Sequence, residues 1–401
     1  MNPHSPDFLI IGGGVVGLAL ARRLSQKFSD SQITLLEKEF EVAQHASGRN
    51  SGVLHAGFYY PSNSLKARLC VEGNRAMRQY CLEQDLPLNT CGKLVVTRSV
   101  EENPELEKLY QRGLNNGVRL ERLTPEEVQE REPNAKSQGL ALFSPDTATV
   151  NPNLVCQTLK RELLAKGVQI ALDTRYLFRR KKSIHTNQGI YQPGFVINAA
   201  GLYADKIAQD FGFGKQYTLL PFKGIYLGYS GSDAVIQTHI YPVPDPRQPF
   251  LGVHFTKTVD GHVKIGPTAI PALWRENYQG LKNINLRETL EILWYESQLF
   301  IQNSFGFRDL ALSEIRKYNP GYFAKMAQTL VKEIDTHQFK HFLKPGIRAQ
   351  LLNIQSLELV QDFVIEGDQD SLHILNAVSP AFTCALSFAD YICENWLTQK
   401  T

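Results

Sequence analysis

The sequence predicts an α/β protein in which a parallel-sheet domain is interleaved with an α+β domain built on an antiparallel sheet. Continuous apolar runs, typical of buried parallel strands, occur at residues 7–11, 33–36 and 195–198. Residues 15–28, between the first two runs, carry apolar side chains at helical spacing. From about 219 to 270, short strands separated by Gly, Pro and Asp are typical of an antiparallel sheet.

A chain of 401 residues is long enough for about two domains. Because α/β texture returns near the C-terminus, we expect the first domain to be discontinuous. The expected segments are 1–85, 146–218 and 345–401 for the first domain, and 86–145 and 219–344 for the second.

Composition excludes several classes of protein. A hydrophobic fraction of 43% is enough for a sizeable core, and a net charge of +3 is too small to indicate nucleic-acid binding. The six cysteines include no C-x-x-C pair and no zinc spacing, which predicts reduced thiols. No apolar stretch approaches the ~20 residues needed to cross a bilayer. We therefore expect a cytoplasmic protein, with attachment to the inner membrane face as an open alternative.

The remaining elements follow from periodicity and from turn residues. Expected helices cover 64–84, 101–116, 151–166, 285–303, 309–316, 320–333 and a last segment from Pro380 to about Leu397. Expected strands cover 93–97, 224–229, 239–243, 250–256, 262–265 and 373–378.

The first glycine turn carries a dinucleotide-binding motif. Gly12-x-Gly14-x-x-Gly17 lies between a strand and a helix, where Gly12 permits the tight turn and Gly14 lets the backbone approach a pyrophosphate. Gly17 permits close packing of helix on strand. Glu37 ends the second strand about 20 residues on, where its carboxylate can accept hydrogen bonds from ribose hydroxyls. The whole context predicts a Rossmann-type domain.

Two features favour FAD over NAD. The motif begins at the extreme N-terminus, as is common for a permanently held flavin. The small polar loop that follows Glu37 can wrap the pyrophosphate and approach the isoalloxazine ring, although a surface turn has the same composition. Its proposed cofactor-binding residues are Ser47, Gly48, Asn50, Ser51 and Gly52.

A third cofactor element is expected near the C-terminus. Ser379 can cap the last helix, and Pro380 suits its first turn. The positive end of this helix, including Ala381, would then stabilise an anionic reduced flavin. An ordinary capped helix is the alternative.

Several strings resemble the L-2-hydroxyglutarate oxidase/dehydrogenase family, which belongs to the D-amino-acid-oxidase-like flavoproteins. The resemblance covers most of the chain, and its strings near Tyr60 and His254 are specific to that family. The strings are Arg49 to Tyr60, Ser64 to Ala67, Cys91 to Leu94, Asn198 to Asp205, Ile240 to Asp245, Pro249 to Thr256, Gly346 to Gln350 and Asn376 to Pro380.

Two histidines are candidates for the base. His55 follows the glycine-rich loop, and a histidine with a pKa near neutral can take an alcohol proton while the α-hydride leaves. A structural role and a covalent link to the flavin remain open for His55. His254 competes with it, on a strand face shared by period two with Phe250 and Gly252.

The resemblance also implies substrate and cofactor contacts. It places Arg348 at the active site, where a guanidinium suits a carboxylate, although a surface salt bridge is the alternative. Tyr60, Lys223 and Tyr241 are further substrate-binding candidates; Lys223 stands where the family usually has arginine. The string from Asn198 implies that Ala200 and Gly201 contact the cofactor.

The function expected is FAD-dependent oxidation of a small carboxylate, namely L-2-hydroxyglutarate to 2-oxoglutarate. An amino-acid oxidase of the same superfamily and a non-catalytic flavin-binding protein are the alternatives. The sequence leaves the electron acceptor open between oxygen, a quinone and a carrier protein.

Residues 288–307 contain many large apolar side chains. Leu290, Leu293, Trp294 and Leu299 are expected roughly on one helical stripe. Such a stripe normally packs on its own domain. The alternative is a weak contact with a membrane surface, which the resemblance suggests because family members often pass electrons to a respiratory chain.

Overall fold

The computed structural model describes residues 4–246 and 250–397. Pro249 and the outermost residues of two predicted segments, 1–3 and 398–401, lie outside the described residues. The chain forms two compact units, and it crosses between them within β14 (Tyr217–Gly224) and β21 (Gly346–Asn353). Unit 1 comprises Met1–Arg49, Pro152–Leu220 and Arg348–Thr401, and unit 2 comprises Asn50–Asn151 and Pro221–Ile347.

The first boundary differs from the expected one. Residues 50–85 and 146–151, expected in the first domain, belong to unit 2. The reason is packing: Ala56 and Phe58 share a buried cluster with Val95 and Leu142 of the unit 2 sheet. The glycine-rich loop is therefore divided, with Ser47 and Gly48 in unit 1 and residues 50–52 in unit 2.

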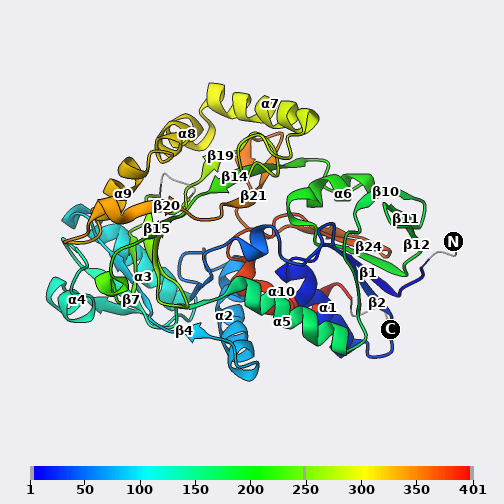
Figure 1. Cartoon of the computed structure of the whole chain (residues 1–401), viewed down its shortest axis with the longest axis horizontal. Coiled ribbons are helices and arrows are strands. Elements are labelled where there is room, and N and C mark those ends of the chain that lie inside the picture. Colours follow the sequence, from blue (N-terminus) through cyan, green and yellow to red (C-terminus); the bar gives the residue numbers. More distant parts are fainter. Residues whose placement is uncertain (1–3, 247–249, 398–401) are drawn as a thin grey trace. The chain divides into compact units, whose positions relative to one another are not determined.

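Unit 1 is built on a six-stranded sheet in the order β23-β24-β13-β1-β2-β9. All neighbours are parallel except the β23–β24 pair. Strands β1, β2, β13 and β24 are buried at every position. Burial on both faces accounts for the apolar runs of the first three. Helix α1 packs against α5 and α10, and Figure 1 shows these three helices together.

The elements of unit 1 follow the chain in three groups. The first group is β1 (Phe8–Ile11), α1 (Val15–Lys27) and β2 (Ile33–Leu36). The second is α5 (Pro152–Ala165), β9 (Gln169–Ala171), β10 (Tyr176–Arg180), β11 (Ser183–Thr186), β12 (Ile190–Tyr191), β13 (Phe195–Asn198) and α6 (Ala204–Asp210). The third is β22 (Glu358–Leu359), β23 (Ile365–Gly367), β24 (Ser371–Ile374) and α10 (Ala381–Asn395).

Unit 2 is built on an eight-stranded sheet in the order β20-β15-β18-β17-β16-β5-β7-β6. The sheet is mixed where the sequence predicted an antiparallel one, because β16 pairs with β5 in parallel. A parallel pair needs a long crossover, and almost 150 residues lie between these two strands. The short spacing of β16, β17 and β18 therefore predicted that these strands pair with one another. It did not predict that β16 also pairs with β5, from the first half of the chain.

Among the described residues, the elements of unit 2 are the strands of this sheet, several shorter strands outside it and six α-helices. The strands are β3 (Val53–Leu54), β4 (Leu88–Asn89), β5 (Lys93–Val96), β6 (Glu121–Leu123), β7 (Ala141–Ser144), β8 (Ala148–Val150), β15 (Leu227–Tyr229), β16 (His239–Pro242), β17 (His254–Lys257), β18 (Val263–Gly266), β19 (Ile270–Pro271) and β20 (Phe339–Phe342). The helices are α2 (Leu65–Glu83), α3 (Asn103–Asn115), α4 (Pro125–Arg131), α7 (Leu286–Gln302), α8 (Phe307–Arg316) and α9 (Pro320–Gln328).

Three strand predictions need correction in length. Of residues 373–378, only the first two lie in a strand, at the end of β24. Residues 224–229 form the end of β14 and the whole of β15, not one strand. Strand β17 begins at His254 instead of residue 250, because its ladder with β18 starts at the His254–Gly266 pair. Phe250 and Gly252 therefore do not share a strand face with His254.

Helix α7 is not a core helix along its predicted stripe. Leu290 and Trp294 are 70% and 65% exposed, and Leu293 is exposed as well, whereas Leu299 is fully buried. At 100° per residue, the exposed three fall on one side and Leu299 lies with Ile292 on the opposite side. Among the described residues, no helix is long and apolar enough to cross a membrane.

Candidate active site

The turn after β1 has the geometry of a pyrophosphate cradle. Gly12 has a φ of +116°, and an added Cβ would lie 2.5 Å from the Ala199 carbonyl oxygen. At Gly17 a Cβ would lie 2.0 Å from the Gly12 carbonyl oxygen, so only glycine lets α1 approach the strand this closely. Gly14 is the N-cap of α1, and no side chain caps the helix there. The positive end of the helix is thus left for a ligand.

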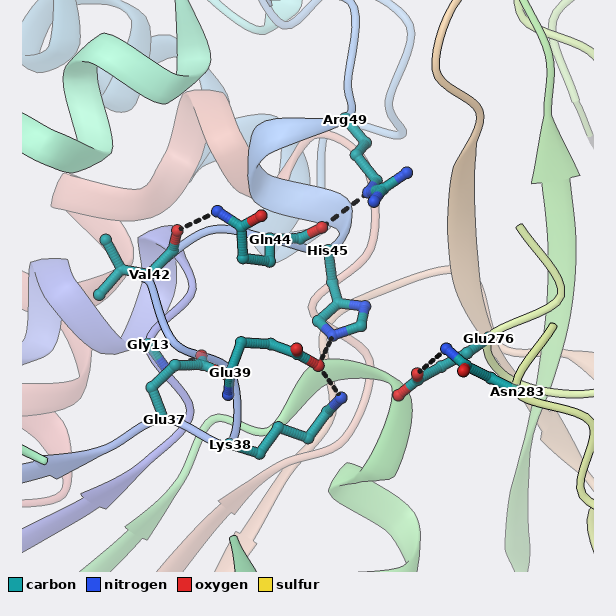
Figure 2. Close-up of polar contacts among 10 residues, drawn as sticks. All are labelled: Gly13, Glu37, Lys38, Glu39, Val42, Gln44, His45, Arg49, Glu276 and Asn283. Atoms are coloured by element: carbon teal, nitrogen blue, oxygen red, sulfur yellow. Dashed lines mark hydrogen bonds and ion pairs between the residues drawn. The ribbon is translucent and has the colours of Figure 1, made fainter. Parts of the chain in front are cut away.

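Glu37 lies where the ribose-binding acid was predicted. One carboxylate oxygen accepts from the Gly13 amide and the other from the Glu39 amide, both at 2.9 Å. Figure 2 shows Glu37 beside Gly13. Burial raises the pKa of Glu37, and the two amide hydrogen bonds oppose that rise. Each carboxylate oxygen keeps a lone pair that a ribose hydroxyl can use.

The loop after Glu37 folds back on the glycine turn. Ser47 Oγ accepts a hydrogen bond of 2.9 Å from the Val15 amide in the first turn of α1. Further along the loop, the Glu39 carboxylate lies between His45 and Lys38 (Figure 2). The hydrogen bond from His45 lowers the pKa of Glu39 to about 2. The sequence did not predict this contact, which fixes the loop that carries Ser47.

Two further cofactor candidates lie beside the glycine turn. The Ala200 Cα would be 3.1 Å from a Cβ placed on Gly12, so the two backbones are in close contact. Asn198 Oδ1 accepts from the Ala200 amide at 3.2 Å and holds this turn. Gly201 follows with a φ of +54° and begins a short 3-10 helix.

The start of α10 differs from the prediction. Its N-cap is Pro380, no side chain caps it, and Ala381 is the first helical residue. Ser379 is thus not the cap, because Pro380 at φ −100° and ψ 39° lies outside the helix and takes the capping position itself. No side chain caps the α10 N-terminus, whereas at α1 the Val15 amide already donates to Ser47 Oγ. The residues of unit 1 therefore fit FAD: two helix starts whose N-cap residue makes no side-chain cap, backbone space at Gly14 and a buried acid.

In unit 2, one side of the eight-stranded sheet is unexpectedly polar. Pairing aligns Lys93 with His239, and Thr256 with Lys264. Because strand side chains alternate, six residues face the same way. We call these the polar face: Lys93, His239, Tyr241, His254, Thr256 and Lys264. All six are buried. The opposite side carries an apolar cluster that includes Leu94, Val96, Ile240, Phe255, Val263 and Ile265.

Lys93 is the most unusual member of the polar face. Its side chain is 0% exposed, and nothing among the described residues accepts a hydrogen bond from Nζ. The ammonium lies over the rings of Tyr241, Tyr59 and Phe58, at 4.3, 5.0 and 5.4 Å from their centroids. Burial lowers the pKa of Lys93 to about 7.

His254 is held in one tautomer. Its Nδ1 lies 2.8 Å from the Gly252 carbonyl oxygen, which can only accept, so Nδ1 carries the proton. Nε2 is then a proton acceptor, and no described residue bonds to it. The ring stacks on Tyr241 with centroids 3.7 Å apart. Burial lowers the pKa of His254 to about 3, so the neutral imidazole is the stable form.

His239, which the sequence did not single out, is fully engaged. Its Nδ1 accepts from the Lys257 amide at 3.0 Å, and its Nε2 lies 2.9 Å from Thr149 Oγ1. Both nitrogens are used by the protein itself, which makes His239 a structural residue. Lys264 donates to the Ser51 carbonyl at 3.2 Å and lies 4.8 Å from the centre of the Tyr226 ring. Burial lowers the pKa of Lys264 to about 8.

The loop that precedes His55 is held by its own side chains. Asn50 Oδ1 accepts from the Gly52 amide at 2.8 Å, and Gly52 has a φ of +79°. The carbonyl of His55 accepts from Asn74 Nδ2 at 3.2 Å, on α2. His55 itself is half-buried in unit 2.

The other predicted substrate residues lie in different places. Tyr241 belongs to the polar face and contacts His254. Lys223 is buried in β14, which belongs to another sheet. Arg348 is half-buried in β21 and belongs to unit 1. Tyr60 is half-buried, and its neighbour Tyr59 is the one that contacts Lys93.

Sequence reasoning missed Lys93, Tyr59, Thr256 and Lys264. A pattern that could have found three of them is the presence of polar residues among apolar ones in three strands, which the structure places at 93–96, 254–257 and 263–266. In a solvent-facing sheet this pattern is ordinary. It indicates a site only once burial of both faces is known.

Comparisons with known proteins agree with the unit 1 geometry. Residues 7–328 match the family described as DAO, FAD dependent oxidoreductase. The chain is 35% identical to an L-2-hydroxyglutarate dehydrogenase of Indibacter alkaliphilus over 98% of both chains. It is also 35% identical to the mitochondrial L-2-hydroxyglutarate dehydrogenase of Mus musculus, over 96% of this chain and 87% of the relative.

Solved structures share the fold. An L-α-glycerophosphate oxidase from Mycoplasma pneumoniae with FAD bound has a TM-score of 0.76 at 23% identity, over 98% of this chain and 95% of that one. A glycine oxidase from Geobacillus kaustophilus has a TM-score of 0.73 at 16% identity, over 98% and 94%. With its glycine turn, buried acid and family match, the chain is an FAD-dependent oxidoreductase and belongs to the DAO family.

Proposed function

We propose that the enzyme oxidises L-2-hydroxyglutarate to 2-oxoglutarate. The observation that carries this proposal is the polar face: a buried surface with two lysines, a neutral histidine and no carboxylate among its six members. Such a surface suits a small dianion. The names of the relatives that match nearly the whole chain support the same substrate.

The reaction removes the hydroxyl proton and the C2 hydride of the substrate. FAD, when bound, supplies the two-electron acceptor. The chain supplies the proton acceptor. His254 is the candidate with the better-defined geometry, because its Nδ1 is committed to the Gly252 carbonyl and its Nε2 is left to accept. Its pKa of about 3 makes it a weak base, so His55 stays the competing candidate. The His254→Gln change should slow anaerobic flavin reduction about 10²- to 10⁴-fold. If His55→Gln slows reduction instead, His55 is the base.

An amino-acid oxidase is the second candidate function. The polar face argues against it, because Lys93 and Lys264 would both repel the α-ammonium group of an amino acid. Only the neutral amine, a minor form near pH 7, would avoid that repulsion. A hydroxy acid has no such charge.

Anaerobic flavin reduction distinguishes these candidates. We expect L-2-hydroxyglutarate to bleach the flavin, and D-2-hydroxyglutarate, L-glutamate, glycine and D-alanine to leave it oxidised. Bleaching by an amino acid but not by L-2-hydroxyglutarate would replace the proposed function with the second candidate. Bleaching by none of these compounds would contradict both.

We also propose that the enzyme contacts a membrane surface through α7, where a quinone could accept the electrons. Leu286, Leu290, Trp294 and Ile301 are all exposed and fall on one side of the helix. Arg287 is exposed beside this stripe and suits anionic headgroups. Exposed Trp with exposed aliphatic side chains is typical of helices that lie at a bilayer interface.

A further inference from the structure

In the protein without a ligand, no acceptor among the described residues compensates the buried charge of Lys93. A buried ammonium without a hydrogen-bond acceptor has lost its hydration and gained little in return. The rings of Tyr241, Tyr59 and Phe58 offset part of that cost. Among the described residues, Lys93 forms no salt bridge.

The groups that face Lys93 include no acid. They are Cys70 on α2, His239 and Tyr241 on β16, His254 on β17, and Tyr59. Thiol, imidazole and phenol are all neutral near pH 7. Among the described residues, nothing that faces Lys93 carries the negative charge that would neutralise its ammonium.

A second unpaired donor lies beside the first. The hydroxyl of Tyr59 is buried and has no hydrogen-bond partner among the described residues. Burial raises the pKa of Tyr59 well above its usual value, so the hydroxyl keeps its proton and remains a donor. An ammonium and a phenol hydroxyl that both lack an acceptor are two donors whose hydrogen bonds the two oxygens of a carboxylate would satisfy.

We propose that Lys93, assisted by Tyr59, binds the distal carboxylate of the substrate and makes the enzyme selective for 2-hydroxydicarboxylates over monocarboxylates. This inference rests on the proposed function and names the side chain that binds the second carboxylate. It replaces Lys223, which lies in another sheet, in that role. Lys264 differs from Lys93 because the Ser51 carbonyl already accepts its hydrogen bond.

The test compares two ligands that cannot be oxidised. 2-Oxoglutarate carries both carboxylates, and 2-oxopentanoate has the same chain with a methyl group at the distal end. Binding to the oxidised holoenzyme is followed by perturbation of the flavin spectrum and by calorimetry, with no turnover. We expect wild type to prefer 2-oxoglutarate, and Lys93→Met to reduce that preference about 10- to 100-fold.

The control variant is Lys257→Met. Lys257 lies in β17, and its ammonium donates to the carbonyls of Asp233 and Ile236, so it has no need of a ligand. This variant should keep the wild-type preference. Tyr59→Phe should reduce the preference by less than Lys93→Met does. Lys93→Gln repeats the test should the methionine variant fail to retain flavin.

The outcomes separate this inference from the proposed function. A wild type that prefers 2-oxoglutarate and a Lys93→Met enzyme that keeps the preference would overturn the role of Lys93 alone. Equal losses for both ligands in Lys93→Met would show a structural role and would also overturn it. A wild type with no preference would contradict the dicarboxylate substrate itself.

Discussion

Gly14 and Gly17, in the turn after β1, have different roles, because an added side chain would meet different atoms at each position. At Gly14 an added Cβ lies 3.0 Å from Ser47 Oγ, the end of a short side chain that can rotate away. At Gly17 it lies 2.0 Å from a backbone carbonyl that cannot. Gly14 therefore borders the space expected for the pyrophosphate, whereas Gly17 is in contact with the backbone of its own turn.

Gly14→Ala should therefore fold but bind FAD at least tenfold more weakly, because the methyl group occupies space that the pyrophosphate needs. Gly17→Ala should lose flavin and also destabilise the apoprotein by about 3 kcal/mol or more. Flavin content and thermal unfolding of the apoprotein measure the two effects. An unstable Gly14→Ala apoprotein would contradict the distinction.

The pKa of Lys93 links this residue to stability. Its folded pKa of about 7 lies below the ordinary value of 10.5, so the folded state binds fewer protons between these limits. Stability should rise with pH across that window, and the whole cost of the buried charge should be present below about pH 7.

The ligand-free wild type should therefore gain more Tm than Lys93→Met between pH 7 and 9. At pH 6 the variant should be at least as stable as wild type, because it removes a buried, unpaired charge. Thermal unfolding at several pH values gives the comparison. Parallel curves for the two proteins would contradict the shifted pKa.

At the scale of elements, α7 differs from an ordinary surface helix, because most of its apolar side chains are exposed and not packed on the core. Its buried side is narrow and contains Ile292 and Leu299, while its broader apolar stripe faces outward. The predicted stripe wrongly included Leu299, which lies on the buried side, and it was assigned to the core. Periodicity indicates that a helix has two sides and not which side is covered.

Trp294→Glu and Leu290→Glu should abolish sedimentation with anionic vesicles and leave Tm within a degree or two, because both side chains are exposed. Leu299→Glu is the matched control, since it buries a charge and should lower Tm strongly. If wild type stays in the supernatant with anionic and neutral vesicles, the membrane contact is refuted.

At the scale of the whole molecule, the cofactor residues of unit 1 and the polar face of unit 2 were not equally predictable. The cofactor residues Gly12, Gly14, Gly17 and Glu37 lie in one βαβ segment, so local spacing was enough to find them. The polar face needed the pairing of Lys93 with His239, which are distant in sequence. A single sequence does not reveal that pairing. The domain boundary predicted at residue 85 was also wrong, because the sequence did not show that Phe58 packs against the strands of the unit 2 sheet.

Because side chains alternate along β17, each position of this strand is committed to one side of the sheet. His254 and Thr256 face the site, and Phe255 between them belongs to the apolar cluster on the other side. A one-residue insertion within this strand would exchange imidazole and phenyl, and would disrupt the apolar cluster and the polar face together. Changes of length are tolerable only in the connection to β18, where the turn at Gly261 has a φ of +87°. Among homologues, insertions and deletions should therefore gather at that turn and avoid the strands on either side of it.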